Sequence, residues 1–403
     1  MAYFITFLIS LFTIIVCTQW YLGKKALRWA DKLNITFGKK WLLKGLVVFA
    51  LIYLNLPLFY SFAVGVPHKP LNSYVMHTVV YPYAIWGSSF LLIFILLMIS
   101  DIFSFLYKKI ISLTRKAPDS RKYPEKYCSS ARRNFLKTAG KGIIATPLLC
   151  SSYGIIFGRE NYITRNVTIN MSGLPEALKK IRIAHISDIH AGLFMGKKEI
   201  GEWVRIIKEI KPDILFITGD FIASSSNSIA ACKEGIQHLS SLMPVYGCLG
   251  NHDYWGHADI LTQDLQRSGI KLFRNDGERY VFSGSEINIC GVEDMMYSHP
   301  DINAASKKLN PGNLTILLSH NPNYFDYVKK RGVNLTLSGH THGGQVDINF
   351  AGFYITPARL ITRYVKGLFS ENDCKLYVNS GLGTIGFPLR LNVPPEITVI
   401  RLA

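Results

Sequence analysis

Five short apolar runs, each followed by residues of metal-binding type, constrain the C-terminal part of this 403-residue chain more than any other feature. The runs IRIAHIS, DILFIT, VYGCLG, LTILLS and NLTLSG have the length and apolar character of strands buried on both faces. Their alternation with amphipathic segments of helical length predicts an α/β domain with sheet layers inside and helices outside. The expected helices cover residues 199–210, 229–242, 258–268 and 324–331.

The polar residues that follow these runs are aspartate, asparagine and histidine. In open α/β sheets, ligands bind at the carboxyl edge of the strands, so side chains that follow separate strands can converge there. A single strand-end histidine is more often a hydrogen-bonded structural group than a ligand, but five such ends in order are hard to reconcile with chance. The predicted metal-binding set is Asp188, His190, Asp220, Asn251, His320, His340 and His342.

The chemistry of this set indicates the kind of ion it would bind. Carboxylate oxygen, amide oxygen and imidazole nitrogen suit Mn, Fe or Zn, and a thiolate zinc site is excluded because no cysteine belongs to the set. Seven donors are too many for one ion, but they fit two ions that share a bridging carboxylate. Such pairs recur in enzymes that displace groups at phosphorus, because they polarise the phosphoryl oxygens and activate a bridging water.

The motifs SDIHAG, GD, GNHD, SH and GHTHGGQ, in this order, resemble those of the calcineurin-like metallophosphoesterase superfamily over residues 181–402. The segment NSGLGTIGFPLRLNVPPEIT resembles, more narrowly, a bacterial membrane-associated branch. The resemblance implies a four-layer α/β-β/α sandwich and two divalent ions bridged by Asp220. It assigns the first ion to Asp188, His190, Asp220 and His342, and the second to Asp220, Asn251, His320 and His340.

The resemblance also implies catalytic roles. His252 matches the residue that contacts the substrate phosphate and acts on the leaving group, with Asp253 as its candidate orienting partner. The expected reaction is hydrolysis of a phosphomonoester, phosphodiester or pyrophosphate by a metal-bridging hydroxide that attacks phosphorus in line. The GD motif continues as GDFIASSS, where many relatives have a further Asp or Gly, so the substrate contacts of this loop are not carried over. The alternative is a catalytically silent membrane scaffold, whose signature would be missing ligands, and none is missing.

The N-terminal part has a different composition. Three apolar segments, at residues 1–22, 41–66 and 74–107, reach the ~20 residues that a membrane-spanning helix needs. Basic residues crowd the connection between the first two segments and the stretch 108–141, whereas the connection between the second and third carries only His68 and Lys69. The positive-inside rule therefore places the first connection and 108–141 in the cytoplasm, and the second connection outside.

The distribution of charge argues against a nucleic-acid partner. Residues 1–160 contain 20 Lys and Arg against 5 Asp and Glu, while residues 161–403 contain 25 against 22, so most of the net charge of +18 lies in the first part. A nearly balanced C-terminal part without a basic stripe does not favour a long polyanion. The expected partners are the membrane and either a small phosphate ester or a lipid-linked substrate.

The segment between these parts decides on which side of the membrane the C-terminal domain lies. ARRNFLK at 131–137 resembles a twin-arginine export signal, and an uncharged segment follows at 143–157. Fifteen helical residues cover about 22 Å, short of a ~30 Å hydrocarbon core, which is typical of a signal h-region or a strained span. We expect export, with a fourth anchor and an external (periplasmic) domain; a cytoplasmic domain behind three spans is the alternative. The expected organisation is a membrane region at 1–107, a basic linker at 108–160 and a phosphoesterase domain at 161–403.

Overall fold

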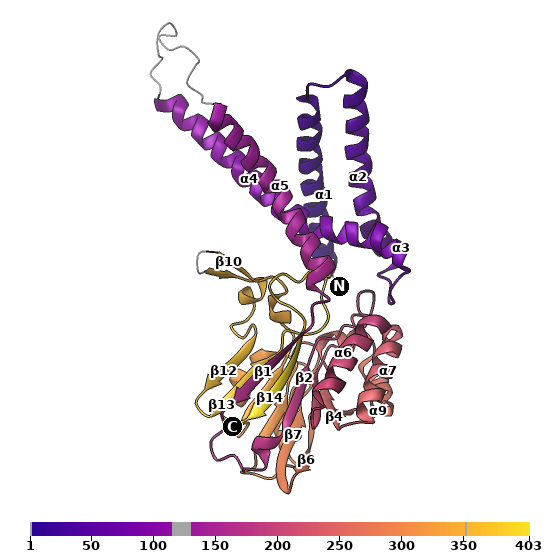
Figure 1. Ribbon diagram of the computed structural model, residues 1–403, viewed down its shortest axis with the longest axis vertical. Helices are drawn as coiled ribbons and strands as arrows, with labels where there is room; N and C mark the ends of the chain where they lie inside the picture. The colour runs from indigo at the N-terminus through magenta and orange to yellow at the C-terminus, as the bar shows by residue number, and fades with distance from the viewer. Residues whose placement is uncertain (1, 115–129, 351–352) are drawn as a thin grey trace. The chain divides into compact units, whose positions relative to one another are not determined.

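The computed structural model describes residues 2–114, 130–350 and 353–403 (Figure 1). Residues 115–129 of the predicted basic linker lie outside this set, as do the side chains of the twin-arginine-like motif. The chain divides into two compact units, which we describe separately. The first comprises Met1–Gly65 and Tyr74–Tyr153, and the second comprises Val66–Ser73 and Gly154–Ala403.

The first unit is made of long helices. Two stretches, Phe37–Val64 and Ser73–Tyr107, are long and apolar enough to cross a membrane. The first predicted span falls within α1, where several side chains lie outside the described set, so it stays a prediction. The helices are α1 (Ala2–Asp31), α2 (Phe37–Val64), α3 (Ser73–Val75), the π-helical turn η1 (Met76–Val80), α4 (Tyr81–Thr114) and α5 (Ser130–Tyr153).

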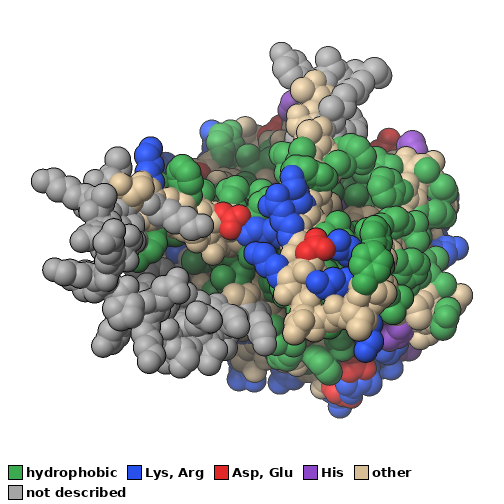
Figure 2. Space-filling model, turned by 90° about the horizontal axis from the view of Figure 1, so that it is seen from above, with side chains coloured by type: hydrophobic (Ala, Val, Ile, Leu, Met, Phe, Trp, Pro, Cys, Tyr) green, Lys and Arg blue, Asp and Glu red, His purple; other side chains and the backbone are tan. Residues whose placement is uncertain are grey.

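Large apolar side chains lie exposed along these helices. Trp41 and Phe49 of α2 and Phe103 of α4 are each more than half exposed. Figure 2 shows such hydrophobic side chains around a group of Lys and Arg. A soluble helix buries its apolar side, so exposed apolar faces of this length fit a membrane environment.

The helices α4 and α5 lie side by side (Figure 1). Ser89 Oγ near the start of α4 donates a hydrogen bond to the carbonyl oxygen of Pro147 near the end of α5, at 3.1 Å. The two helices are therefore antiparallel. The uncharged segment predicted at 143–157 is not an isolated short element, because it forms the C-terminal part of α5 and continues through the π-helical turn η2 (Gly154–Gly158).

The second unit contains two six-stranded sheets. The first has the order β1-β14-β2-β3-β4-β5, in which β2 to β5 are parallel and β14 is antiparallel to β2. Its strands are β1 (Ile163–Ile169), β2 (Arg182–Ile186), β3 (Ile214–Thr218), β4 (Val245–Cys248), β5 (Lys271–Phe273) and β14 (Glu396–Leu402).

The second sheet has the order β12-β13-β9-β8-β7-β6, with β13, β9, β8 and β7 parallel. A separate two-stranded ribbon pairs β10 (Ile348–Phe350) with β11 (Phe353–Ile355). The strands of the second sheet are β6 (Asp276–Phe282), β7 (Ser285–Gly291), β8 (Thr315–Leu318), β9 (Leu335–Ser338), β12 (Gly367–Glu371) and β13 (Cys374–Val378).

Successive side chains of a strand point to opposite faces of its sheet, so each strand contributes to two layers of the core. In β3, Leu215 and Ile217 pack against helices, while Ile214 and Phe216 face the other sheet. Leu317 of β8 packs on the opposite side of the second sheet. This gives the layers helix, sheet, sheet, helix, so the predicted four-layer α/β-β/α sandwich is confirmed. The covering helices are α6 (Lys197–Ile210), α7 (Ile229–Ser240) and α9 (Ala258–Arg267) on the first sheet, and α10 (Ile302–Ser306) and α11 (Phe325–Val328) on the second.

Some elements differ from the sequence expectation. The helix expected over 324–331 is regular only over Phe325–Val328, because the chain turns at Gly332 (φ +75°) to enter β9. The hairpin β6–β7 and the strands β1, β12, β13 and β14 were not predicted. Several of these strands, such as β12, are partly exposed. They therefore lack the continuous apolar run that is typical of a strand buried on both faces.

Candidate metal centre

All seven predicted ligands lie at the carboxyl ends of parallel strands. The strands β2, β3 and β4 belong to the first sheet, and β8 and β9 to the second, so the residues after them meet along one edge of the sandwich. The donor residues are Asp188 and His190 after β2, Asp220 after β3, Asn251 at the start of α8 (Asn251–Trp255), His320 after β8, and His340 and His342 after β9.

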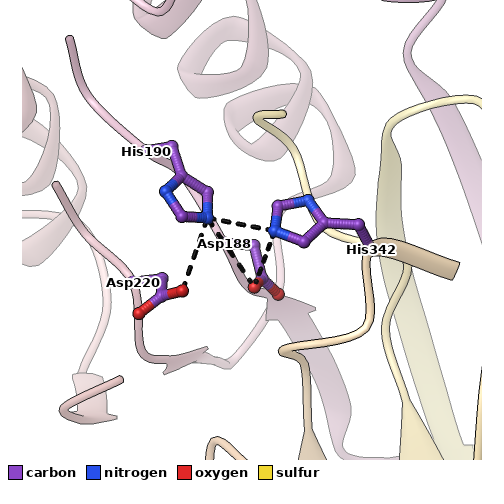
Figure 3. A group of neighbouring side chains, drawn as sticks. All are labelled: Asp188, His190, Asp220 and His342. Carbon is purple, nitrogen blue, oxygen red and sulfur yellow. Dashed lines mark hydrogen bonds and ion pairs between the residues drawn. The ribbon is translucent and has the colours of Figure 1, made fainter. Parts of the chain in front are cut away.

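The first donor set is a buried group of two carboxylates and two imidazoles (Figure 3). The Nε2 atoms of His190 and His342 lie 3.0 Å apart. His342 Nε2 lies 3.4 Å from Asp188 Oδ1, and His190 Nε2 lies 3.4 Å from Asp220 Oδ2. One donor atom from each of the four residues falls within 4.8 Å of every other.

The second donor set lies on the other side of Asp220. His320 Nε2 lies 3.1 Å from Asn251 Oδ1 and 3.3 Å from Asp220 Oδ2. His340 Nδ1 lies 2.9 Å from Asn251 Oδ1 and 3.3 Å from His320 Nε2. The same oxygen of Asp220 therefore belongs to both donor sets, which is the arrangement of a bridging carboxylate.

These distances fit divalent ions. Ligand atoms lie about 2.0–2.2 Å from a bound zinc ion, so neighbouring donors of one ion are roughly 3 to 3.5 Å apart. Most of the separations in the two sets fall in this range, and all the donors except His340 are buried. The structure brings the predicted ligands together in the two groups that the family resemblance implied.

The backbone at the ligands is strained. Asp188, His190, Asp220, His340 and His342 all have positive φ, between +49° and +71°. This conformation is uncommon for residues other than glycine, costs about 1–3 kcal/mol each and clusters at functional sites. The strain is consistent with a site whose side-chain directions matter more than local stability.

Two glycines allow the donor loops to pack closely. A Cβ at Gly250 would lie 2.2 Å from Asp220 Oδ1, and one at Gly339 would lie 1.8 Å from Ser187 Oγ and 2.2 Å from Asp188 Oδ2. Any larger residue at either position would displace a carboxylate of the centre. This agrees with the close approach that glycines beside the ligands permit.

The pKa values of two of the histidines are shifted in opposite directions, so these residues differ in their protonation before an ion binds. Burial lowers the pKa of His190 to about 3, so its imidazole is neutral and able to coordinate. Burial would also lower the pKa of His320, but the Asp220 carboxylate outweighs it and raises that pKa to about 10. His320 Nδ1 donates its hydrogen to the Thr218 carbonyl oxygen at 2.7 Å, so an ion would replace the proton on Nε2.

His252 is oriented by the main chain. Its Nδ1 lies 2.5 Å from the carbonyl oxygen of Ala223. Because a carbonyl oxygen only accepts hydrogen bonds, Nδ1 carries a hydrogen, and Nε2 is the nitrogen left to exchange a proton. The ring lies beside His190, with their centroids 4.6 Å apart.

Asp253 acts through the backbone rather than through the His252 ring. Its carboxylate accepts hydrogen bonds from the amides of Asp220 and Phe221 at 2.9 Å and from the amide of Gly250 at 2.8 Å. A longer bond of 3.3 Å comes from the amide of Ile222, next to Ala223. We expected Asp253 to orient the His252 ring directly. Instead, its hydrogen bonds stabilise the loop whose Ala223 carbonyl holds that ring.

Arg390 is a buried residue to which sequence reasoning gave no role. Its guanidinium donates to the carbonyl oxygens of Ser380 and Gly381 at 3.0 Å. Arg390 Nε also donates to the carbonyl oxygen of Gly383 in this loop, and the Gly383 amide donates a hydrogen bond of 2.7 Å to the Asp188 carbonyl oxygen. Arg390 therefore positions the chain around the first donor set. The only signal in the sequence was its place in the NSGLGTIGFPLRLNVPPEIT segment.

A cavity of about 230 Å³ lies beside the first donor set within the second unit. His190 and His252 line it together with residues of the segments 66–68, 192–195, 223–228 and 382–386. It is the space through which a substrate held at the donor edge would extend.

The comparisons with known proteins agree with this geometry. The profile of the calcineurin-like phosphoesterase family matches residues 181–344. The uncharacterized metallophosphoesterase YkuE of Bacillus subtilis is 32% identical over 283 residues, which cover 68% of this chain and 97% of that protein. The phosphodiesterase YaeI of Escherichia coli is 25% identical over 276 residues, covering 68% and 99%.

The name of a third relative indicates a membrane region. The transmembrane protein with metallophosphoesterase domain of Danio rerio is 28% identical over 277 residues, which cover 64% of this chain and 61% of that protein. The extent of the match to YkuE, together with the fold and the donor edge, establishes the family. The chain belongs to the calcineurin-like phosphoesterase family and is a hydrolase that acts on phosphate esters.

Proposed function

We propose that the enzyme hydrolyses its phosphate ester at a centre of two divalent ions. The observation that carries this proposal is the position of Asp220 Oδ2, 3.4 Å from His190 Nε2 and 3.3 Å from His320 Nε2. One ion would be held by Asp188, His190, Asp220 and His342, and the second by Asp220, Asn251, His320 and His340.

The protein side chains have separate tasks in this reaction. When bound, two such ions acidify a water molecule and polarise the phosphoryl oxygens. As an imidazolium, His252 gives its Nε2 proton to the leaving oxygen and becomes the neutral ring whose Nδ1 hydrogen stays bonded to the Ala223 carbonyl oxygen. Asp253 keeps the Asp220 loop in place through the main-chain amides.

The membrane region suggests where the substrate is found. Apolar helices that attach the enzyme to a membrane favour a lipid-linked or envelope phosphate ester over a freely diffusing one. The relative YaeI is a phosphodiesterase by name, so a diester is the first substrate to test. A soluble phosphate ester, and a scaffold that keeps the fold without turnover, are the alternatives.

We also propose that the chain crosses the membrane several times and that the catalytic unit lies outside. The antiparallel packing of α4 and α5 supports a return crossing after α4. The loop Val66–Ser73, which carries few basic residues, belongs to the catalytic unit, whereas the basic stretches lie in the other connections. By the positive-inside rule, this loop and the unit that contains it face the exterior.

The two-metal proposal is tested with the full-length protein in detergent and bis(4-nitrophenyl) phosphate as substrate. Asp220→Asn keeps the shape of the bridging side chain but removes its charge. Because outer-shell changes alone cost 10–100-fold in metal sites, we expect turnover to fall at least about 100-fold. Asp373→Asn removes the same charge at an exposed turn and serves as the control.

Two results would contradict the proposal. Near-normal turnover and metal content in Asp220→Asn would exclude a bridging role for this carboxylate. A wild-type protein that hydrolyses no phosphate ester, with or without added Mn, Fe or Zn, would favour the scaffold.

A further inference from the structure

The loop Val66–Ser73 leaves the helix α2 but packs within the catalytic unit. Ser228 Oγ donates a hydrogen bond of 2.7 Å to the carbonyl oxygen of His68. Pro70 packs against Gly196, where an added Cβ would lie 2.5 Å from Pro70 Cγ. These two contacts fix the loop at the cavity beside the metal centre, and Val66, Pro67 and His68 line that cavity.

The cavity lies beside His252, the residue proposed to protonate the leaving group. A general acid must come within about 2.6–3.2 Å of the oxygen that it protonates. His252 lines the cavity, and its Nε2 is the nitrogen available for this step. An alcohol protonated by His252 as it departs from phosphorus would extend into the cavity, where Val66, Pro67 and His68 of the loop lie.

The cavity wall is chemically suited to an apolar group. Apart from histidines, the charged residues of the described lining are Arg159 and Glu199. Arg159 donates to Glu160 Oε1 at 2.6 Å and to the Phe194 carbonyl oxygen at 3.1 Å, and Glu199 accepts from the Gly196 amide at 3.0 Å. Much of the remaining wall is apolar: Val66 and Pro67 come from the loop, and the larger side chains are Leu193, Phe194, Met195, Leu382 and Ile385.

We infer that the loop Val66–Pro70 is a substrate-recognition element that selects phosphate esters with an apolar leaving alcohol. The inference rests on the proposed function, because it uses the role of His252 at the leaving oxygen. It goes further by assigning one wall of the leaving-group pocket to a connection between membrane helices. An uncharged apolar alcohol gains contact with this wall, whereas a carboxylated alcohol loses hydration and meets an Arg159 guanidinium that already donates to Glu160 and to the Phe194 carbonyl oxygen.

The test compares two diesters with the full-length protein in detergent. One is methyl 4-nitrophenyl phosphate, and the other carries a carboxylate on the nitrophenyl ring. Wild type should have the higher kcat/KM for the uncharged ring. Val66→Lys, at an exposed position of the wall, should move the ratio of kcat/KM toward the carboxylated ester by about fivefold or more, because a cation then faces the carboxylate.

Leu71→Lys is the matched control. Leu71 lies in the same loop but outside the cavity lining, so its substitution should leave the ratio unchanged. Metal content measured on each variant shows whether the centre is intact. If Val66→Lys retains its metal and hydrolyses both esters in the wild-type ratio, the loop is not a wall of the pocket and the inference is wrong.

Failure of the proposed function gives a different result. A wild-type protein that hydrolyses neither ester would overturn the activity and, with it, the pocket. If Val66→Lys does shift the ratio, the diesters methyl phenyl phosphate in solution and methyl decyl phosphate in micelles distinguish a soluble aromatic alcohol from a lipid alcohol as the source. The ester that wild type prefers identifies that source.

Discussion

At the scale of residues, the site depends on side chains whose direction is fixed by the main chain. His252 is held by the Ala223 carbonyl, and His320 by the Thr218 carbonyl. Each contact assigns the hydrogen to Nδ1 and leaves Nε2 for chemistry or coordination. Two histidines whose Nδ1 atoms are held in the same way thus serve different roles because of what their Nε2 atoms face.

Replacing His252 by glutamine tests its role as a proton donor. His252→Gln keeps a polar side chain but cannot supply a titratable proton, so turnover of a phenyl ester should fall by about 100-fold or more. A 4-nitrophenyl ester should be affected less, because its leaving group needs little protonation. Metal content should stay the same, since His252 belongs to neither donor set.

The exposed His299 offers a control, and His299→Gln should have wild-type kinetics. Loss of metal from His252→Gln would show that the residue coordinates an ion. An equal loss of turnover with both leaving groups would exclude the proton-donor role.

The seven candidate ligands could be predicted from the sequence because each one closely follows a strand-like run. The sequence did not indicate the partners of Asp253 or the position of Arg390, since their hydrogen bonds join loops that are far apart in the chain. Nor did it indicate the positive φ values at five ligands, because such strain is imposed by the tertiary structure.

At the scale of elements, the strands buried on both faces were the easiest to predict. β3 and β8 are continuous apolar runs, whereas β6 alternates buried and exposed residues and was missed. The long apolar helices α2 and α4 could likewise be predicted from their apolar length alone. The attachment of the loop between them to the catalytic unit had no signal in the sequence, because it consists of a few contacts such as Ser228 with His68.

An engineered disulfide tests this attachment and its side of the membrane together. A Cβ at residue 196 comes close enough to residue 70 for Pro70→Cys and Gly196→Cys to pair, since disulfides need Cβ atoms about 3.5–4.5 Å apart. Disulfides persist in oxidising external compartments and are rare in the cytosol. We therefore expect the pair to link in cells without added oxidant, as seen by mass spectrometry of the joined peptides.

Lys32→Cys combined with Gly196→Cys is the control, because residue 32 belongs to the connection predicted to be cytoplasmic. A Pro70–Gly196 cysteine pair that stays reduced in cells, together with a cytoplasmic signal from a reporter fused after Ala403, would contradict the external placement.

At the scale of the whole molecule, the chain combines a basic N-terminal part that contains long apolar helices with a nearly charge-balanced phosphoesterase. Residues 1–160 hold 20 basic against 5 acidic residues, and residues 161–403 hold 25 against 22. The two parts could be predicted separately, because each has its own composition and periodicity. The place of Val66–Ser73 in the second unit could not, since it depends on contacts between residues far apart in the chain.

The metal content of the purified full-length protein tests the two-metal centre most directly. Elemental analysis of wild type should give two divalent ions per chain, and Asn251→Ala, which removes a donor from the second set only, should retain about one. This measurement reports the occupancy of both donor sets without the use of any substrate. A single ion in wild type, or two ions retained in Asn251→Ala, would contradict the assignment of two metals bridged by Asp220.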